Sequence, residues 1–147
     1  MRKQGSEGGG TILLVDDDYD FRLQHRLYLE GRGYTVWECA GAEEARRILE
    51  ERRPDAVVAD LMMEDDDAGF ALCYFIKRRW KNLPVIMVTG VAAETGFDFD
   101  AATAEERAWV KADAVLAKPV RLEQLHGMIE RLLGERALGS GPAGANE

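Results

Sequence analysis

Little in this sequence indicates a secreted protein, a membrane protein or a protein with a structural zinc site. Among 147 residues there are two cysteines, Cys39 and Cys73, and neither has a second Cys or a His at the spacing of a zinc site. We expect both to be buried packing thiols, because an unpaired cysteine behaves as a small hydrophobe. No apolar run approaches the roughly 20 residues that span a bilayer, and the N-terminus lacks a signal-peptide core. The expected location is therefore cytoplasmic, with no membrane partner.

An excess of positive charge is also missing. The formal net charge is -8 and the pI is near 4.9, and no basic stripe interrupts this acidity over a helix-length window. A phosphate backbone would be repelled, so we expect no nucleic-acid partner. The chain length fits one domain. Its glycine-rich ends, residues 1–10 and 135–147, are predicted to be flexible tails around a domain at residues 11–134.

Between these tails, short apolar runs alternate with helix-like stretches. All of the runs except the second are nearly uninterrupted by polar residues, which is typical of parallel strands covered on both faces. The β-α order, repeated five times, predicts an α/β fold with a doubly wound parallel sheet and right-handed crossovers. The predicted strands are residues 12–15, 34–38, 56–59, 85–88 and 114–117, and the predicted helices are residues 19–31, 42–53, 68–81, 103–112 and 122–133.

Polar residues stand at the ends of four predicted strands. In open parallel sheets, ligands bind outside the carboxyl ends of the strands, so these side chains should share one cleft. Converging carboxylates repel one another unless a cation lies among them, and carboxylate oxygens suit Mg²⁺. A lysine and a hydroxyl beside that ion would neutralise phosphoryl oxygens, so the pattern indicates phosphoryl transfer to a carboxylate. The residues are Asp16 and Asp17, then Asp60, Thr89 and Lys118.

Four segments carry a family resemblance. ILLVDDD, DAVVADLMM, LPVIMVTG and DAVLAKPV resemble, in order and in spacing, those of the response regulator receiver domain family, over about residues 11–134. The resemblance implies a single (βα)5 domain with the flavodoxin-like strand order 2-1-3-4-5. It also implies a stand-alone, chemotaxis-type response regulator of a two-component phosphorelay, a cytoplasmic signal-transduction phosphoprotein.

The resemblance implies a role for each acidic residue. Asp60 would be the phosphoacceptor and would also contact the metal. Asp17, with Asp16 acting largely through water, and the backbone carbonyl of Met62 would complete the Mg²⁺ site. Such a protein is not a turnover enzyme; only self-phosphorylation and slow self-dephosphorylation are expected.

The remaining roles concern the phosphoryl group and the partners. Thr89 would bond a phosphoryl oxygen and Lys118 would pair with it, and the peptide between Lys118 and Pro119 is often cis in the family. A sensor histidine kinase or a histidine phosphotransfer protein would supply the phosphoryl group. With only a short tail after the last helix, the output would be docking on a downstream protein or relay, as a monomer or a phosphorylation-dependent homodimer.

The chain departs from the family pattern on its output face. Val115 stands where the family usually has Tyr or Phe, so the aromatic rotamer switch is absent at that position. Residues 91–112 form a longer segment than usual, which is either a partner-recognition surface or a longer surface loop. Phe97, Phe99 and Trp109 are candidates for a relocated ring.

Departures also lie beside the phosphoacceptor. The acidic run at residues 64–67 is either a solvated loop or a local attraction for Mg²⁺. Met62 and Val91 occupy positions that influence hydrolysis of the phosphoryl group in the family, and neither side chain can orient a water. We therefore expect slow self-dephosphorylation.

Two other functions compete with this interpretation. Asp16 and Asp18 could form the D-x-D of an aspartyl-nucleophile phosphohydrolase, although an acidic pair soon after Lys118 is missing. The chain could also be a receiver-like binding module that is never phosphorylated, with Asp60 a buried or capping acid. For Asp18, capping of the first helix is favoured over a metal role.

Overall fold

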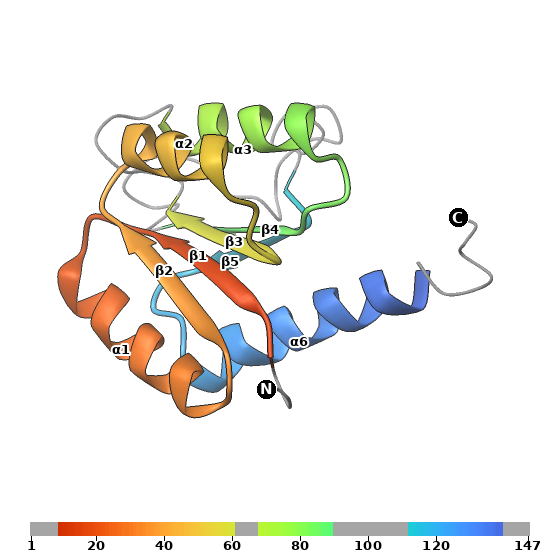
Figure 1. The fold of residues 1–147 in the computed structure, drawn as a ribbon. Helices are drawn as coiled ribbons and strands as arrows, with labels where there is room; N and C mark the ends of the chain where they lie inside the picture. Colours follow the sequence, from red (N-terminus) through yellow and green to blue (C-terminus); the bar gives the residue numbers. More distant parts are fainter. Residues whose placement is uncertain (1–8, 61–67, 90–111, 140–147) are drawn as a thin grey trace.

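A computed structural model describes residues 9–60, 68–89 and 112–139 of the chain. Strands and helices alternate from residue 9 to residue 89, and a fifth strand and a last helix follow in residues 112–139 (Figure 1). The strands are β1 (Thr11–Val15), β2 (Thr35–Cys39), β3 (Ala56–Asp60), β4 (Val85–Thr89) and β5 (Ala114–Ala117), and the helices are α1 (Tyr19–Gly31), α2 (Ala42–Glu51), α3 (Ala68–Arg79) and α6 (Leu122–Gly139). No helix in these ranges is long and apolar enough to cross a membrane.

The strands form one parallel sheet in the order β2-β1-β3-β4-β5, as the resemblance implied. The register aligns the carboxyl ends of neighbouring strands. Asp60 at the end of β3 lies opposite Val88, and Thr89 at the end of β4 lies opposite Ala117. Polar residues at these ends therefore meet at the carboxyl end of the sheet, where the sequence predicted the site.

Helices cover both faces of the sheet, with α2 and α3 on one side and α1 and α6 on the other (Figure 1). Side chains alternate along each strand, so that Leu13 and Val15 join the cluster under α2 and α3 while Ile12 and Leu14 join the cluster under α1 and α6. β3 and β4 are buried along their whole length. The doubly wound α/β prediction is confirmed.

The two edge strands show where apolar runs mislead. β2 begins at Thr35, one residue later than predicted, and it is mostly half-buried, as its alternating pattern indicated. β5 was predicted to be covered on both faces, but its side chains range from half-buried to exposed. The reason is its place at the edge of the sheet, because an apolar run does not tell a central strand from an outer one.

Helix ends differ from the predictions by a few residues. α2 ends at Glu51, because Arg52 is extended on the approach to Pro54. α3 ends at Arg79, earlier than the predicted residue 81. α6 runs on to Gly139, into the predicted tail, since one glycine inside a helix costs only about 1 kcal/mol. The predicted helix at residues 103–112 lies almost wholly outside the described residues.

Candidate functional site

Two carboxylates of the site are buried at strand ends and a third is exposed beside them. Asp16 and Asp17 directly follow β1, and Asp60 is the last residue of β3. Asp16 is 1% exposed and Asp60 is 5% exposed, whereas Asp17 faces solvent. One oxygen from each lies within 4.8 Å of the others. The predicted convergence of the three acids is therefore present.

Lys118 supplies a positive charge to this cluster. It follows β5, and its Nζ lies 3.1 Å from Asp16 Oδ2 and 3.5 Å from Asp60 Oδ2. Burial lowers the pKa of Lys118, but the Asp16 and Asp60 carboxylates outweigh burial and raise it above its ordinary value. The ammonium also lies 4.7 Å from the centre of the Phe21 ring, which fixes its position further. Lys118 is thus charged and held over the carboxylates.

Thr89 places a buried hydroxyl at the same edge. The residue is 6% exposed, and no described group hydrogen-bonds its Oγ1. Its backbone carbonyl accepts a hydrogen bond from the Lys118 N–H at 2.8 Å, which holds the two residues side by side. A buried hydroxyl without a partner is costly, so it favours an incoming oxygen that can bond to it.

The loop that carries Asp16 is fixed by its own short hydrogen bonds. Asp16 Oδ1 accepts from the Asp18 N–H at 2.8 Å, and Asp18 Oδ1 accepts from the N–H groups of Asp20 and Phe21. Asp18 is therefore the N-cap of α1, as predicted. Burial raises the pKa of Asp16, against the lowering effect of the Asp18 N–H and the Lys118 charge.

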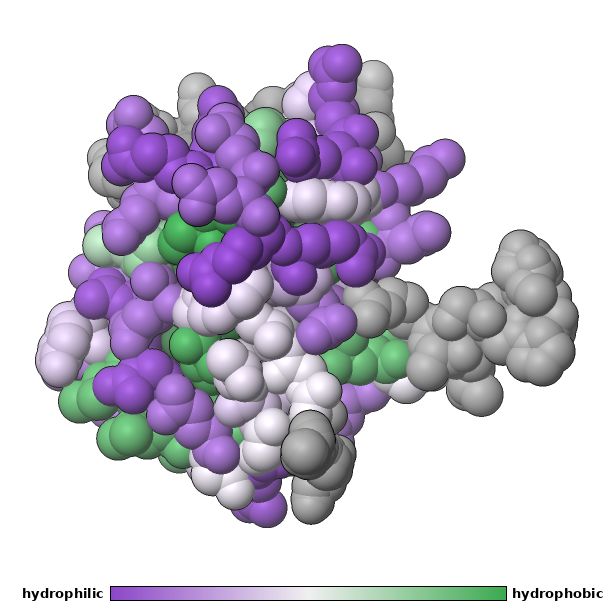
Figure 2. All heavy atoms as spheres, in the orientation of Figure 1, coloured by the Kyte–Doolittle hydropathy of each residue, from purple (hydrophilic) through white to green (hydrophobic). Residues whose placement is uncertain are grey.

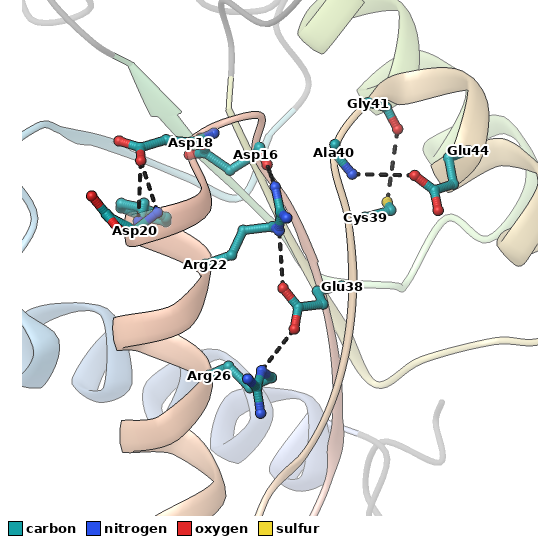
Figure 3. A network of polar contacts seen from close by, with 11 residues as sticks. Asp16, Asp18, Asp20, Arg22, Arg26, Glu38, Cys39, Ala40, Gly41 and Glu44 are labelled. Carbon is teal, nitrogen blue, oxygen red and sulfur yellow. Dashed lines mark hydrogen bonds and ion pairs between the residues drawn. The ribbon is translucent and has the colours of Figure 1, made fainter.

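An arginine–glutamate network supports the loop from behind, and sequence analysis missed it. Figure 3 shows Arg22 lying between Asp16 and Glu38. Arg22 Nη1 donates to the Asp16 carbonyl at 2.7 Å, and its Nε donates to Glu38 Oε1 at 2.9 Å. Arg26 Nε lies 2.7 Å from Glu38 Oε2. The sequence signal was an arginine one turn after the Asp18 cap, where it can fold back onto the loop.

His25 supports the lysine side of the site. This histidine of α1 is 3% exposed, and its ring centre lies 4.3 Å from that of Phe21, the ring that contacts Lys118. Burial lowers the pKa of His25, and the Lys118 charge lowers it further against the effect of a hydrogen bond with the Val120 backbone. His25 is therefore a buried ring that packs behind the lysine side of the site.

The charges at the site fit a divalent cation. Three carboxylates face one lysine, which leaves two negative charges unbalanced within the cluster. All three donors are carboxylate oxygens, the kind of ligand that Mg²⁺ takes, and two of them are buried where repulsion is strong. The residues present therefore fit a bound Mg²⁺.

Several predicted features lie outside the described residues. Among them are Met62 with its backbone carbonyl, the acidic run at residues 64–67, nearly all of the segment 91–112, and the rings of Phe97, Phe99 and Trp109. Val115 is described, and it packs half-buried against the cluster under α2 and α3. The peptide between Lys118 and Pro119 is cis. Cys39 and Cys73 are both buried, as predicted.

Comparison with known sequences gives a consistent result. A family model described as the response regulator receiver domain matches residues 12–130. The transcriptional regulatory protein AfsQ1 of Streptomyces coelicolor is 34% identical over 128 residues, which are 86% of this chain and 53% of AfsQ1. Adventurous-gliding motility protein Z of Myxococcus xanthus is 35% identical over 125 residues, 80% of this chain and 8% of that protein. The chain thus spans only part of these relatives.

Solved structures agree with the sequence comparison. NtrX from Brucella abortus superposes with a TM-score of 0.74 at 27% identity, covering 89% of this chain and 28% of that one. A response regulator receiver domain protein from Clostridium thermocellum superposes with a TM-score of 0.72 at 25% identity, covering 87% of this chain and 97% of that one.

Proposed function

This chain belongs to the response regulator receiver domain family, and from that membership we propose that Asp60 accepts a phosphoryl group from a phosphohistidine of a partner protein. The observation that carries the proposal is the convergence of three carboxylates and Lys118 at one sheet edge. Burial of the Asp60 carboxylate beside two other acids is unfavourable for folding. The arrangement is explained if Asp60 is a nucleophile that attacks phosphorus, with the neighbouring groups balancing the charge of the phosphoryl group.

The transfer step follows from the positions of the side chains. A carboxylate oxygen of Asp60 attacks phosphorus and forms an O–P bond, while the P–N bond to the donor imidazole breaks and its electron pair returns to nitrogen. The Lys118 ammonium then pairs with oxygens of the transferred phosphoryl group, because these oxygens now carry the negative charge that the Asp60 carboxylate carried before. The Thr89 hydroxyl donates a hydrogen bond to one of those oxygens, and that bond satisfies its buried Oγ1.

We propose that Asp16, Asp17 and Asp60 hold Mg²⁺ together with the Met62 carbonyl. When bound, the ion supplies positive charge next to the phosphoryl oxygens. Asp17 is exposed and is the residue best placed for direct contact, whereas Asp16 is already paired with Lys118 and with the Asp18 N–H. Arg22 positions this loop through the Asp16 carbonyl and is a positioning residue.

The proposed partners follow from the family and from the charges. The donor is a sensor histidine kinase or a histidine phosphotransfer protein, and the signal is passed by docking on a downstream protein or by relay. Met62 and Val91 follow Asp60 and Thr89 by two positions in the sequence and neither side chain can orient a water, so the acyl phosphate is proposed to hydrolyse slowly. An acyl-phosphate half-life of only seconds at room temperature would contradict that last point.

Incubation with acetyl phosphate and Mg²⁺, followed by intact-mass measurement, tests the proposal. We expect one added phosphoryl group on the wild-type chain and none on the Asp60→Asn variant. Asp20→Asn is the matched control, because Asp20 is an exposed acid near the site whose side chain takes no part in it. An unmodified wild-type chain would instead favour the binding-module alternative. Steady ester turnover that survives loss of Asp60 would favour the phosphohydrolase.

A further inference from the structure

A groove on the face opposite α1 and α6 shares no residue with the proposed phosphorylation site. It runs between α2 and α3 and has a volume of about 510 Å³. Figure 2 shows hydrophilic side chains gathered over these two helices. We call it the arginine groove, and it is lined by Arg46, Ala71, Tyr74, Phe75, Arg78 and Arg79.

Each arginine of the groove is placed against an aromatic ring. The guanidinium of Arg46 lies 5.2 Å from the ring centre of Phe75, and that of Arg78 lies 5.6 Å from the ring centre of Tyr74. Arg79 lies 4.8 Å from the ring of Trp80. A cation–π contact of this kind restrains the guanidinium while its N–H groups stay available for a carboxylate.

The groove arginines differ in their partners from those near the phosphorylation site. Arg22 and Arg26 both pair with Glu38. For Arg46, Arg78 and Arg79, by contrast, no carboxylate of the described part of the chain lies within ion-pair distance. Three donors of one sign therefore line the groove with no ion-pair partner among residues 9–60, 68–89 and 112–139.

The lining chemistry selects the kind of ligand. The whole chain carries a net charge of -8, so the groove is a local positive region on an acidic protein. Screening limits such a field to about 8 Å at physiological ionic strength, which favours a ligand that enters the groove over one steered from afar. Ala71 and Phe75 add apolar surface between the arginines, and a small polyanion would leave that surface wet.

We propose that the arginine groove binds an acidic peptide segment of a partner protein. Carboxylates of the segment pair with Arg46 and Arg78, and an apolar side chain between them packs on Phe75. The bland alternative is that the guanidinium–ring contacts only stabilise the two helices, with the basic last turn of α3 complementing its dipole. A peptide-binding measurement distinguishes the proposal from this alternative, because arginines that only stabilise the helices would bind no peptide.

The test is an amide NMR titration of the full chain with the synthetic peptide acetyl-Glu-Glu-Leu-Glu-Glu-amide. We expect saturable shifts at Ala71, Tyr74 and Phe75, which weaken when salt is raised to about 0.3 M. The same peptide with Gln for every Glu should cause no such shifts, and Ser in place of Leu should weaken them. The double variant R46E/R78E should lose affinity by about tenfold or more.

Arg32→Glu is the matched control variant. Arg32 is an exposed arginine that lies 4.7 Å from the Tyr28 ring on α1, on the other side of the sheet, so the charge and the ring contact are alike but the groove is intact. It should bind the peptide like the wild type, and so should Asp60→Asn. If R46E/R78E loses its dispersed spectrum, R46Q/R78Q takes its place.

Four outcomes would overturn the proposal. They are the absence of saturable shifts at the groove, equal binding by wild type and R46E/R78E, equal shifts with inorganic pyrophosphate, and tighter binding of a single-stranded oligonucleotide. The third would make the groove a site for small polyanions. The fourth would make it a nucleic-acid contact.

Discussion

Besides its proposed role in phosphoryl transfer, Lys118 is expected to stabilise the fold. Its ammonium offsets the buried charges of Asp16 and Asp60, which would otherwise repel each other in a region with little solvent. We predict that Lys118→Met lowers the free energy of unfolding by about 2 kcal/mol in metal-free buffer, measured by urea denaturation. Added Mg²⁺ should recover part of this loss.

Lys81→Met is the control for that measurement, because Lys81 is an exposed lysine beyond the end of α3. Its effect should stay within about 0.5 kcal/mol. Equal urea midpoints for the two variants would show that the acids at the sheet edge do not need the lysine charge in the folded state.

His25 makes stability depend on pH. Its pKa in the folded state lies below the ordinary 6.5, mainly because of burial, so the unfolded chain binds a proton more readily. Its contribution to stability is present above about pH 6.5 and is lost as the pH falls from there through the folded-state pKa. We predict that wild-type stability declines over this window, measured by urea midpoints, and that His25→Leu flattens the decline.

His126→Phe serves as the comparison for His25→Leu. His126 packs edge-to-face against Tyr28 and Tyr34, and a phenyl ring can keep those contacts. The decline should persist in this variant because His25 is intact. An unchanged slope in His25→Leu would assign the pH dependence to other groups.

At the scale of elements, the turn between α1 and β2 depends on one glycine. Gly33 has φ of 98°, a left-handed backbone angle, directly after the helix cap at Arg32. Gly31, by contrast, is the last residue of α1 and has open space where a Cβ would lie. The two glycines of this short segment therefore have opposite conformational requirements.

We predict opposite effects of the same substitution at these two positions. Gly33→Ala should lower the free energy of unfolding by about 1 kcal/mol or more, because alanine is strained at this angle. Gly31→Ala should raise it by about 0.5–1 kcal/mol through better helix propensity. Thermal denaturation of both variants measures the difference. The turn interpretation would be refuted by two shifts of the same sign.

At the scale of the whole molecule, the sheet separates two hydrophobic clusters that share every strand. Leu49 belongs to the cluster under α2 and α3, and Leu125 to the cluster under α1 and α6. Trp37 and Trp80 both pack against the first cluster. The chain has a third tryptophan, so fluorescence recorded in a Trp109→Phe background reports that face. Because each strand contributes to both clusters, the two faces should unfold together.

We predict that Leu125→Ala shifts the tryptophan fluorescence transition as well as the far-ultraviolet circular dichroism transition. The expected cost is about 2–5 kcal/mol, and Leu49→Ala should behave alike. Leu27→Ala is the control, since Leu27 is 56% exposed. A dichroism shift without a fluorescence shift in Leu125→Ala would mean that the faces unfold separately.

The sequence by itself determined the α/β order, the strand positions and the acidic, hydroxyl and lysine residues of the site. These signals are local. An apolar run predicts a strand, and a polar residue directly after the run is predicted to lie at the carboxyl end of the sheet. The parallel register then brings Asp16, Asp60, Thr89 and Lys118 together, as their strand ends implied. This part of the prediction needed no knowledge of long-range contacts.

Only the tertiary structure decided which residues support or surround that site. Arg22 and Glu38 pair because α1 packs beside β2, and nothing in their spacing indicates the contact. The exposure of β5 depends on its edge position, and the arginine groove depends on α2 lying against α3. Such features arise from segments distant in sequence, and the physical reason is that side-chain pairing and burial are settled by packing between elements.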